Sequence, residues 1–168
     1  MQSQPQALEA APESVKSRFL SLEYLDMPGF TYIKSKPGSL EDLQEFTAIV
    51  FHALNIGIFS RRESDNYIGG EYFVGKALGI KVKVALADDS EFSDYQFWMT
   101  FSTDEVWIED QGIFENLADV VARYLTLKDY QVARDPSSGR IGAPKIIYSR
   151  KIGGTASTHD QVEVKQVP

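Results

Sequence analysis

The sequence predicts an α+β domain in which two principal helices pack on a mainly antiparallel sheet. Runs of alternating apolar and polar residues, the pattern of half-buried strands, follow one another closely between about residues 67 and 109. Helical periodicity occurs in two separate places, without the regular alternation of strand and helix that indicates a parallel sheet. The expected order of elements is roughly α-β-β-β-α-β-β.

The chain has 168 residues, a length that favours a single domain. Residues 1–14 are polar with two prolines, and residues 152–168 are rich in Gly, Ser, Thr, Gln and Val without a large aromatic side chain. Both compositions are typical of poorly ordered termini. We therefore expect a disordered N-terminal tail over 1–14, one α+β domain over 15–151 and a flexible C-terminal tail over 152–168.

The first expected elements are a strand and a helix. Residues 17–33 carry enough apolar side chains to enter the core, and the part after Pro28-Gly29, from Phe30 to Lys34, can form a strand. Ser39 can cap the helix that follows, and Gly57 can end it. One apolar stripe predicts that this helix lies on the core, and it comprises Leu40, Leu43, Phe46, Val50 and Leu54.

Three consecutive segments predict an antiparallel meander after a hairpin turn at Gly69-Gly70. Ile80–Ala87 and Tyr95–Ser102 alternate cleanly, so that one set of side chains in each faces the core. A tight connection would pair the second run with the short segment 105–109, with 99 opposite 108 and 101 opposite 106. In that register every inward side chain lies on the same face.

A second helix and a second hairpin complete the expected fold. The helix covers about Ile113 to Leu125. Tyr130–Ala133 and Lys145–Ser149 then form two strands joined by a turn-rich segment. The apolar positions that we expect on the inner face of the helix are Ile113, Leu117, Val120, Val121 and Tyr124.

Composition excludes several classes of function. The chain has no cysteine, which removes disulfide frameworks, thiolate metal sites and cysteine nucleophiles. A net charge of −7 argues against a dedicated nucleic-acid binder, and no apolar run is long enough to span a membrane. We expect a cytoplasmic protein, without contact to a membrane and without a metal or cofactor.

Local catalytic motifs are weak. The segment Gly70–Lys76 has the spacing of a phosphate-binding loop, but its interior is bulky and Ala77 stands where that loop needs Ser or Thr. His52 falls on the polar flank of the first helix, and His159 lies in the expected C-terminal tail. We therefore assign no catalytic residue and lean against an enzyme.

A polar segment keeps an enzyme as an alternative. Residues 61–67 are dense in hydrogen-bonding side chains, with a further carboxylate close by in the sequence. Such a run is more often a solvated loop that caps turns. If the protein acts on a small molecule, the site residues are expected to be Arg62, Asp65, Asn66 and Glu71.

The most unusual feature of the sequence is an acidic segment, residues 85–119. It contains ten acidic residues, and no Lys or Arg lies between Lys83 and Arg123. It also contains both tryptophans, which the alternation places on the face opposite Met99. The acidic residues are Asp88, Asp89, Glu91, Asp94, Asp104, Glu105, Glu109, Asp110, Glu115 and Asp119.

Trp98 and Trp107 have two readings. In one, a helix covers their face of the sheet and both rings belong to the core. In the other, the rings are exposed anchors surrounded by acids, a composition found at binding hot spots. The partner-binding residues in that case are Asp88, Asp89, Glu91, Asp94, Trp98, Asp104, Glu105, Trp107, Glu109 and Asp110.

These features favour a protein-binding module whose acidic face attracts a basic protein. In size, acidity and lack of cysteine the chain broadly resembles bacterial immunity proteins that inhibit nuclease toxins, and that resemblance implies a toxin as the basic partner. The first alternative is a small-molecule enzyme with its site around residues 61–71. The second is a homo-oligomeric assembly protein that associates through an exposed sheet edge or the tryptophan face.

Overall fold

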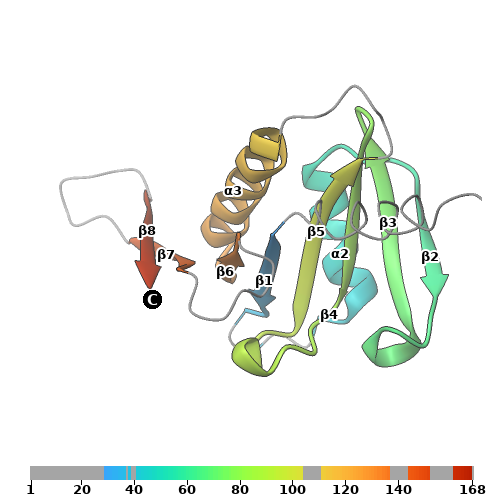
Figure 1. The fold of residues 1–168 in the computed structure, drawn as a ribbon, viewed down its shortest axis with the longest axis horizontal. Helices are drawn as coiled ribbons and strands as arrows, with labels where there is room; N and C mark the ends of the chain where they lie inside the picture. The colour runs from blue at the N-terminus through green and yellow to red at the C-terminus, as the bar shows by residue number, and fades with distance from the viewer. Residues whose placement is uncertain are drawn as a thin grey trace, which may run out of the picture.

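The computed structural model describes residues 29–36, 38, 41–103, 111–136, 144–151 and 161–167. These residues form one antiparallel sheet of eight strands, in the order β2-β3-β4-β5-β1-β6-β7-β8 (Figure 1). The predicted fold class is confirmed, because two helices of this part of the chain pack on the sheet. The strands are β1 (Phe30–Lys34), β2 (Phe59–Glu63), β3 (Glu71–Ala77), β4 (Ile80–Leu86), β5 (Phe97–Thr103), β6 (Gln131–Asp135), β7 (Lys145–Lys151) and β8 (Gln161–Val167).

The two helices, α2 (Leu43–Ala53) and α3 (Gln111–Leu127), divide the sheet between them. α2 lies against β3 and β4, whereas α3 lies against β5, β6 and β7 (Figure 1). Short 3-10 helices, η1 (Ile68–Gly70) and η2 (Ser90–Phe92), precede β3 and β5. Side chains of both long helices enter one apolar core on the same face of the sheet.

α2 begins later than the sequence predicted. Its N-cap is Asp42, whose carboxylate accepts a hydrogen bond of 2.8 Å from the Glu45 backbone amide, while Glu45 reaches back to the Asp42 amide. This capping box satisfies two donors of the first turn and outcompetes the expected cap. Ser39 is therefore not the cap, and it lies outside the described residues together with Leu40. The helix ends at Ala53, with Leu54 as C-cap.

The alternation in β4 and β5 is confirmed. The predicted pairing of β5 with a third strand at residues 105–109 is wrong. Met99 of β5 lies between Val84 of β4 and Thr31 of β1. Both hydrogen-bonding edges of β5 are thus occupied at the position that was expected to pair with residue 108. The segment 105–109 itself lies outside the described residues.

Both edge strands of the sheet were missed. Residues 59–63 form β2 and pair with β3 from Phe59↔Gly75 to Glu63↔Glu71, although residues 61–67 were interpreted as a polar run typical of a solvated loop. Residues 161–167, expected within a flexible tail, form β8 and pair with β7 over seven positions. Val162 and Val164 of β8 alternate with polar residues, and this β-branched pattern outweighs the polar composition.

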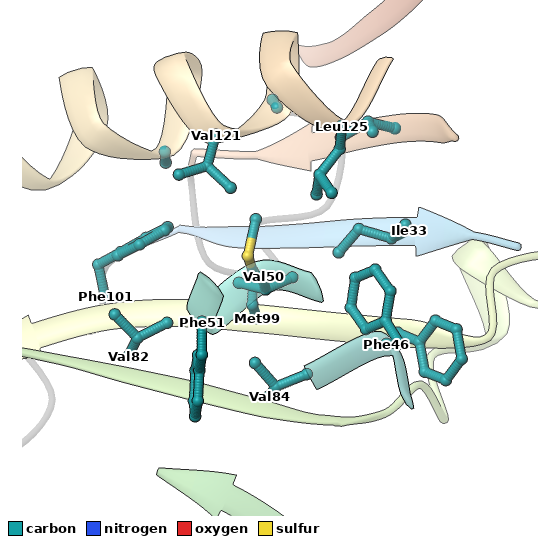
Figure 2. Packing of buried hydrophobic residues seen from close by; sticks show 14 of the residues in the cluster. Ile33, Phe46, Val50, Phe51, Val82, Val84, Met99, Phe101, Val121 and Leu125 are labelled. Atoms are coloured by element: carbon teal, nitrogen blue, oxygen red, sulfur yellow. The ribbon is translucent and has the colours of Figure 1, made fainter. Parts of the chain in front are cut away.

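α3 turns a different face inward from the one predicted. Val121 is buried as expected, but Val120 is 61 % exposed and Ile113 is 42 % exposed. The helix instead buries a neighbouring stripe, from which Val121 and Leu125 point toward the sheet (Figure 2). Two of its members are alanines, whose small side chains permit a close approach to the sheet. That buried stripe comprises Phe114, Ala118, Val121, Ala122 and Leu125.

The core between the helices and the sheet is built largely from the residues that alternation predicted. Phe46 of α2 stacks on Phe97 of β5 with ring centroids 4.4 Å apart. Val50 and Phe51 of α2 lie beside Val84 and Met99 of the sheet, while Val121 and Leu125 approach from α3 (Figure 2). Burial of this apolar surface is the main stabilising contribution to the fold.

Candidate functional site

Several acids in the described part of the acidic segment pair with basic residues from elsewhere in the sequence. Six of its ten acids are described. Glu91 pairs with Lys145 of β7, and Asp94 lies 3.8 Å from Lys34 of β1. The segment is therefore less of an uncompensated acidic surface than its sequence suggested. The remaining site residues of the acidic prediction, Asp104, Glu105, Trp107, Glu109 and Asp110, lie outside the described residues.

The loop before β5 is held by Asp89. Its carboxylate accepts a 2.8 Å hydrogen bond from the hydroxyl of Tyr32 and another from the backbone amide of Glu91, which caps η2. Burial and the Asp89 carboxylate raise the pKa of Tyr32 well above its ordinary value. Asp89 thus has a structural role, whereas Asp88 beside it is exposed.

Trp98 belongs to a second apolar cluster on the sheet face opposite α2 and α3, which we call the open face. Only 9 % of Trp98 is exposed, so it is not an exposed anchor. Phe30 meets its ring edge-on at 5.3 Å, and Tyr67 lies over it at 5.8 Å. Aromatic side chains, rather than one of the described helices, surround the ring. The buried members of the cluster are Tyr32, Ala85, Phe92, Trp98 and Ala133.

The predicted polar site around residues 61–71 is not assembled. Arg62 lies opposite Tyr72 and Arg61 opposite Phe73, so the two arginines point to opposite faces of the sheet. Glu71 forms an ion pair with Arg61 rather than with Arg62. A shallow hollow of about 400 Å³ beside β2 is lined by Asp65, but Arg62, Asn66 and Glu71 do not line it.

A polar network connects α3 to two buried side chains of the sheet, Arg134 and Tyr148. Arg134 of β6 is only 3 % exposed and pairs with Glu115, while its other terminal nitrogen lies 3.3 Å from the hydroxyl of Tyr148. That hydroxyl donates a 2.8 Å hydrogen bond to Asp119, which also accepts one of 2.7 Å from Arg123. These five side chains form one connected network, which joins α3 to β6 and β7.

The pKa values of the network follow from these contacts. Burial alone would raise the pKa of Asp119, but the hydrogen bonds from Arg123 and Tyr148, together with the charges of Arg123 and Arg134, hold it below its ordinary value. Burial raises the pKa of Tyr148, so its hydroxyl keeps its proton and donates. The arrangement is that of a structural polar network, with a donor for each carboxylate.

A groove between the two helices carries both apolar and charged side chains. It encloses about 470 Å³, within the range of known ligand sites, and more of its lining is apolar than polar. Ile49 and His52 line it from α2, Tyr124 lines it from α3, and Lys128 lines it from the turn that follows α3. Lys36 lies over the ring of Tyr130 at the same place, 4.8 Å from the ring centroid.

A second apolar stripe runs along α3 beside its buried face, and one member of this stripe, Tyr124, lines the groove. Successive members are four, three, four and three residues apart, the spacing of a coiled-coil seam. Ile113, Val120 and Leu127 are 42 %, 61 % and 41 % exposed, whereas Leu117 and Tyr124 are partly buried against the core. We call Ile113, Leu117, Val120, Tyr124 and Leu127 the outer stripe.

Sequence reasoning had assigned four of these five residues to the core, because a helix with apolar residues on two adjacent faces offers two stripes of the same period. The groove therefore went unrecognised as a site. His52, by contrast, is exposed as predicted. The alanines of α3 could have indicated which face of the helix packs on the sheet. They permit a close contact with the sheet that the bulkier side chains of the outer stripe would prevent.

Comparison with protein-family models, curated proteins and solved structures finds no match for this chain. None of the helices among the described residues is long and apolar enough to cross a membrane. The described residues also contain no group of three or more His, Asp or Glu side chains arranged to hold a metal ion. The function proposed below therefore rests on the geometry of the described surface.

Proposed function

We propose that this protein is a protein-binding module, and that the groove between α2 and α3 receives an amphipathic helix of its partner. The observation that carries this proposal is the outer stripe of α3. Isolated exposed apolar residues are ordinary on protein surfaces, but a continuous row of them beside a hollow marks an interaction site. The row runs the length of α3, which gives a helical partner several contacts rather than one.

The spacing of the outer stripe favours a helix as the occupant. A helix presents apolar side chains at intervals of three and four residues, so it can match the rows on α3 along several turns. Ile49 of α2 and Tyr124 of α3 lie on the two sides of the groove. A helix laid between them would contact both walls.

The charges of the groove define the chemistry of that helix. Lys36 lies over Tyr130, and Lys128 lies 5.7 Å from the ring centroid of Tyr124. Both lysines therefore hold their ammonium groups over the aromatic lining at one end of the outer stripe. Acidic side chains at the corresponding end of the partner helix would be complementary to them.

A peptide with apolar residues at the same spacing and glutamates at one end provides the test. We expect it to shift the amide NMR signals of Ile49, Val120 and Tyr124, and we expect Val120→Asp to weaken its binding about tenfold or more. Ser60→Asp adds the same charge on an exposed strand and should leave binding unchanged. Equal binding of a scrambled peptide, or shifts confined to the open face, would overturn the proposal.

A second candidate is the basic partner suggested by the acidic segment, in which case the protein would act as a cytoplasmic immunity protein of a toxin. The observation that favours it is the exposure of Asp88 together with that of the Asp94 side chain, which is 82 % exposed. This candidate predicts binding to a basic protein that weakens steeply with salt and is lost in the double variant Asp88→Lys, Asp94→Lys. Unchanged binding by that variant would exclude it.

A further inference from the structure

The outer edge of β8 offers a surface for a second copy of this chain. β8 is the last strand of the sheet, and its other edge pairs with β7 over all seven residues. Five of those residues are exposed, including Val164 at 38 %, and no proline interrupts the strand. A long regular edge strand presents a row of backbone donors and acceptors that another strand can satisfy.

We infer that two copies of the protein associate through β8, in an antiparallel pair centred on Val164. Strands related by a two-fold axis always pair antiparallel, and the register that uses all seven residues places Val164 opposite Val164 of the second copy. It also places Glu163 opposite Lys165 of the second copy, and Lys165 opposite its Glu163. Directly opposed charges of unlike sign stabilise an antiparallel pair.

The charged side chains of β8 favour this register over the registers whose two-fold axis is shifted by one residue along the strand. A two-fold axis through position 163 would set the two Glu163 side chains against each other, and an axis through position 165 would do the same for the two lysines. Within one chain Glu163 and Lys165 already lie on the same face, with their charged atoms 3.5 Å apart and both side chains about half exposed. Pairing would extend this ion pair into an alternating group of four charges.

The opposite edge of the sheet lacks this complementarity. β2 has five residues, so its full-length two-fold register would set the two Arg61 side chains directly against each other. Like charges in that position disfavour pairing. The association is therefore expected at one edge only, which closes the assembly at two copies rather than extending it into a fibre.

Charge exchange along β8 tests the inference with the full chain. By sedimentation equilibrium we expect the unaltered protein to approach twice the mass of one chain as its concentration rises. Glu163→Lys and Lys165→Glu should each remain monomeric, because each opposes like charges in the paired register. The double variant Glu163→Lys, Lys165→Glu restores opposite charges and should dimerise again.

A mixing experiment separates pairing from any general effect of charge. Equal amounts of the two single variants oppose lysines of one chain to glutamates of the other, so they should form a mixed dimer although neither associates alone. Glu63→Lys, on the β2 edge, serves as the control and should dimerise normally. A monomeric unaltered protein at high concentration would overturn the inference, as would single variants that dimerise like it.

Discussion

Tyr148 shows how single side chains join elements that are distant in the sequence. Its hydroxyl lies between Arg134, 3.3 Å away, and Asp119, to which it donates. The guanidinium of Arg134 is nearly inaccessible to water, so removal of an acceptor from this network would leave a buried charge without its partner. Such groups connect protonation directly to stability.

Asp119 should make the protein sensitive to acid. Its pKa is lowered in the folded state from the ordinary value of 3.8, so its stabilising contribution is complete above about pH 4 and is lost as the pH falls through the folded pKa. Asp119→Asn should therefore reduce the urea midpoint at neutral pH and flatten its decline below about pH 4. Asp65→Asn, an exposed control, should leave the pH profile unchanged. An identical acid profile for Asp119→Asn would contradict the account.

Gly29 is the position at which a single added methyl group should be most harmful. A Cβ atom there would lie 2.4 Å from the Asp135 carbonyl oxygen and 2.5 Å from the Pro136 Cα atom. Both are backbone atoms, so they cannot move aside as the end of a side chain can. We expect Gly29→Ala to lower the free energy of unfolding by about 1–3 kcal/mol, measured by urea denaturation.

Gly57 provides the matched control for Gly29. A Cβ atom at Gly57 would have nothing within 4 Å, so Gly57→Ala should be neutral or slightly stabilising. Equal losses of stability for the two variants would mean that the close approach of Gly29 to the chain after β6 is incorrect.

At the scale of elements, α3 is the helix that links the stability of the core with the proposed binding groove. Its inner stripe closes the core, and Tyr124 of the outer stripe lines the groove. The sequence period alone could not separate the two, because Val120 and Val121 are adjacent and equally apolar. The two stripes differ in how closely each face of α3 packs against the sheet. The small side chains of Ala118 and Ala122 permit the closer packing of the inner stripe.

Val120 and Val121 allow the two roles to be measured separately. Val121 is 3 % exposed, so Val121→Ala should lower the free energy of unfolding by about 1–3 kcal/mol. Val120→Ala should change it by less than about 0.5 kcal/mol, because that side chain is mainly in water. Binding of the amphipathic peptide should show the reverse order of sensitivity. A larger stability loss for Val120→Ala would place the wrong face of α3 against the sheet.

At the scale of the whole molecule, local pattern predicted those parts of the fold that local forces decide. Alternation identified β4 and β5, and turn chemistry identified the β6–β7 hairpin, because both depend on residues close together in the sequence. Gly69-Gly70, expected to form a hairpin turn, lies in η1 within the longer connection from β2 to β3. β2 and β8 were missed because their polar residues suit a solvated edge as well as a loop. The pairing of β5 with β1 joins residues 99 and 31, and no local pattern reports such a contact.

Charge was the property that sequence reasoning interpreted least well. Counting acids along residues 85–119 suggested an uncompensated surface, but Lys34, Arg134 and Lys145 reach Asp94, Glu115 and Glu91 from other strands. A cluster in the sequence becomes a cluster in space only where the fold brings no opposite charge to it. The groove was missed for the related reason that its two walls come from different helices.

The most direct test of a partner-binding groove is photo-crosslinking from position 120 in the full chain, in the cells that produce the protein. We expect the adduct to identify a partner segment with apolar residues at three- and four-residue intervals and acidic residues at one end. Position 60, on the exposed strand β2, should give no adduct with that segment. Crosslinking of a basic partner from position 88, with none from position 120, would contradict the account and favour the acidic segment.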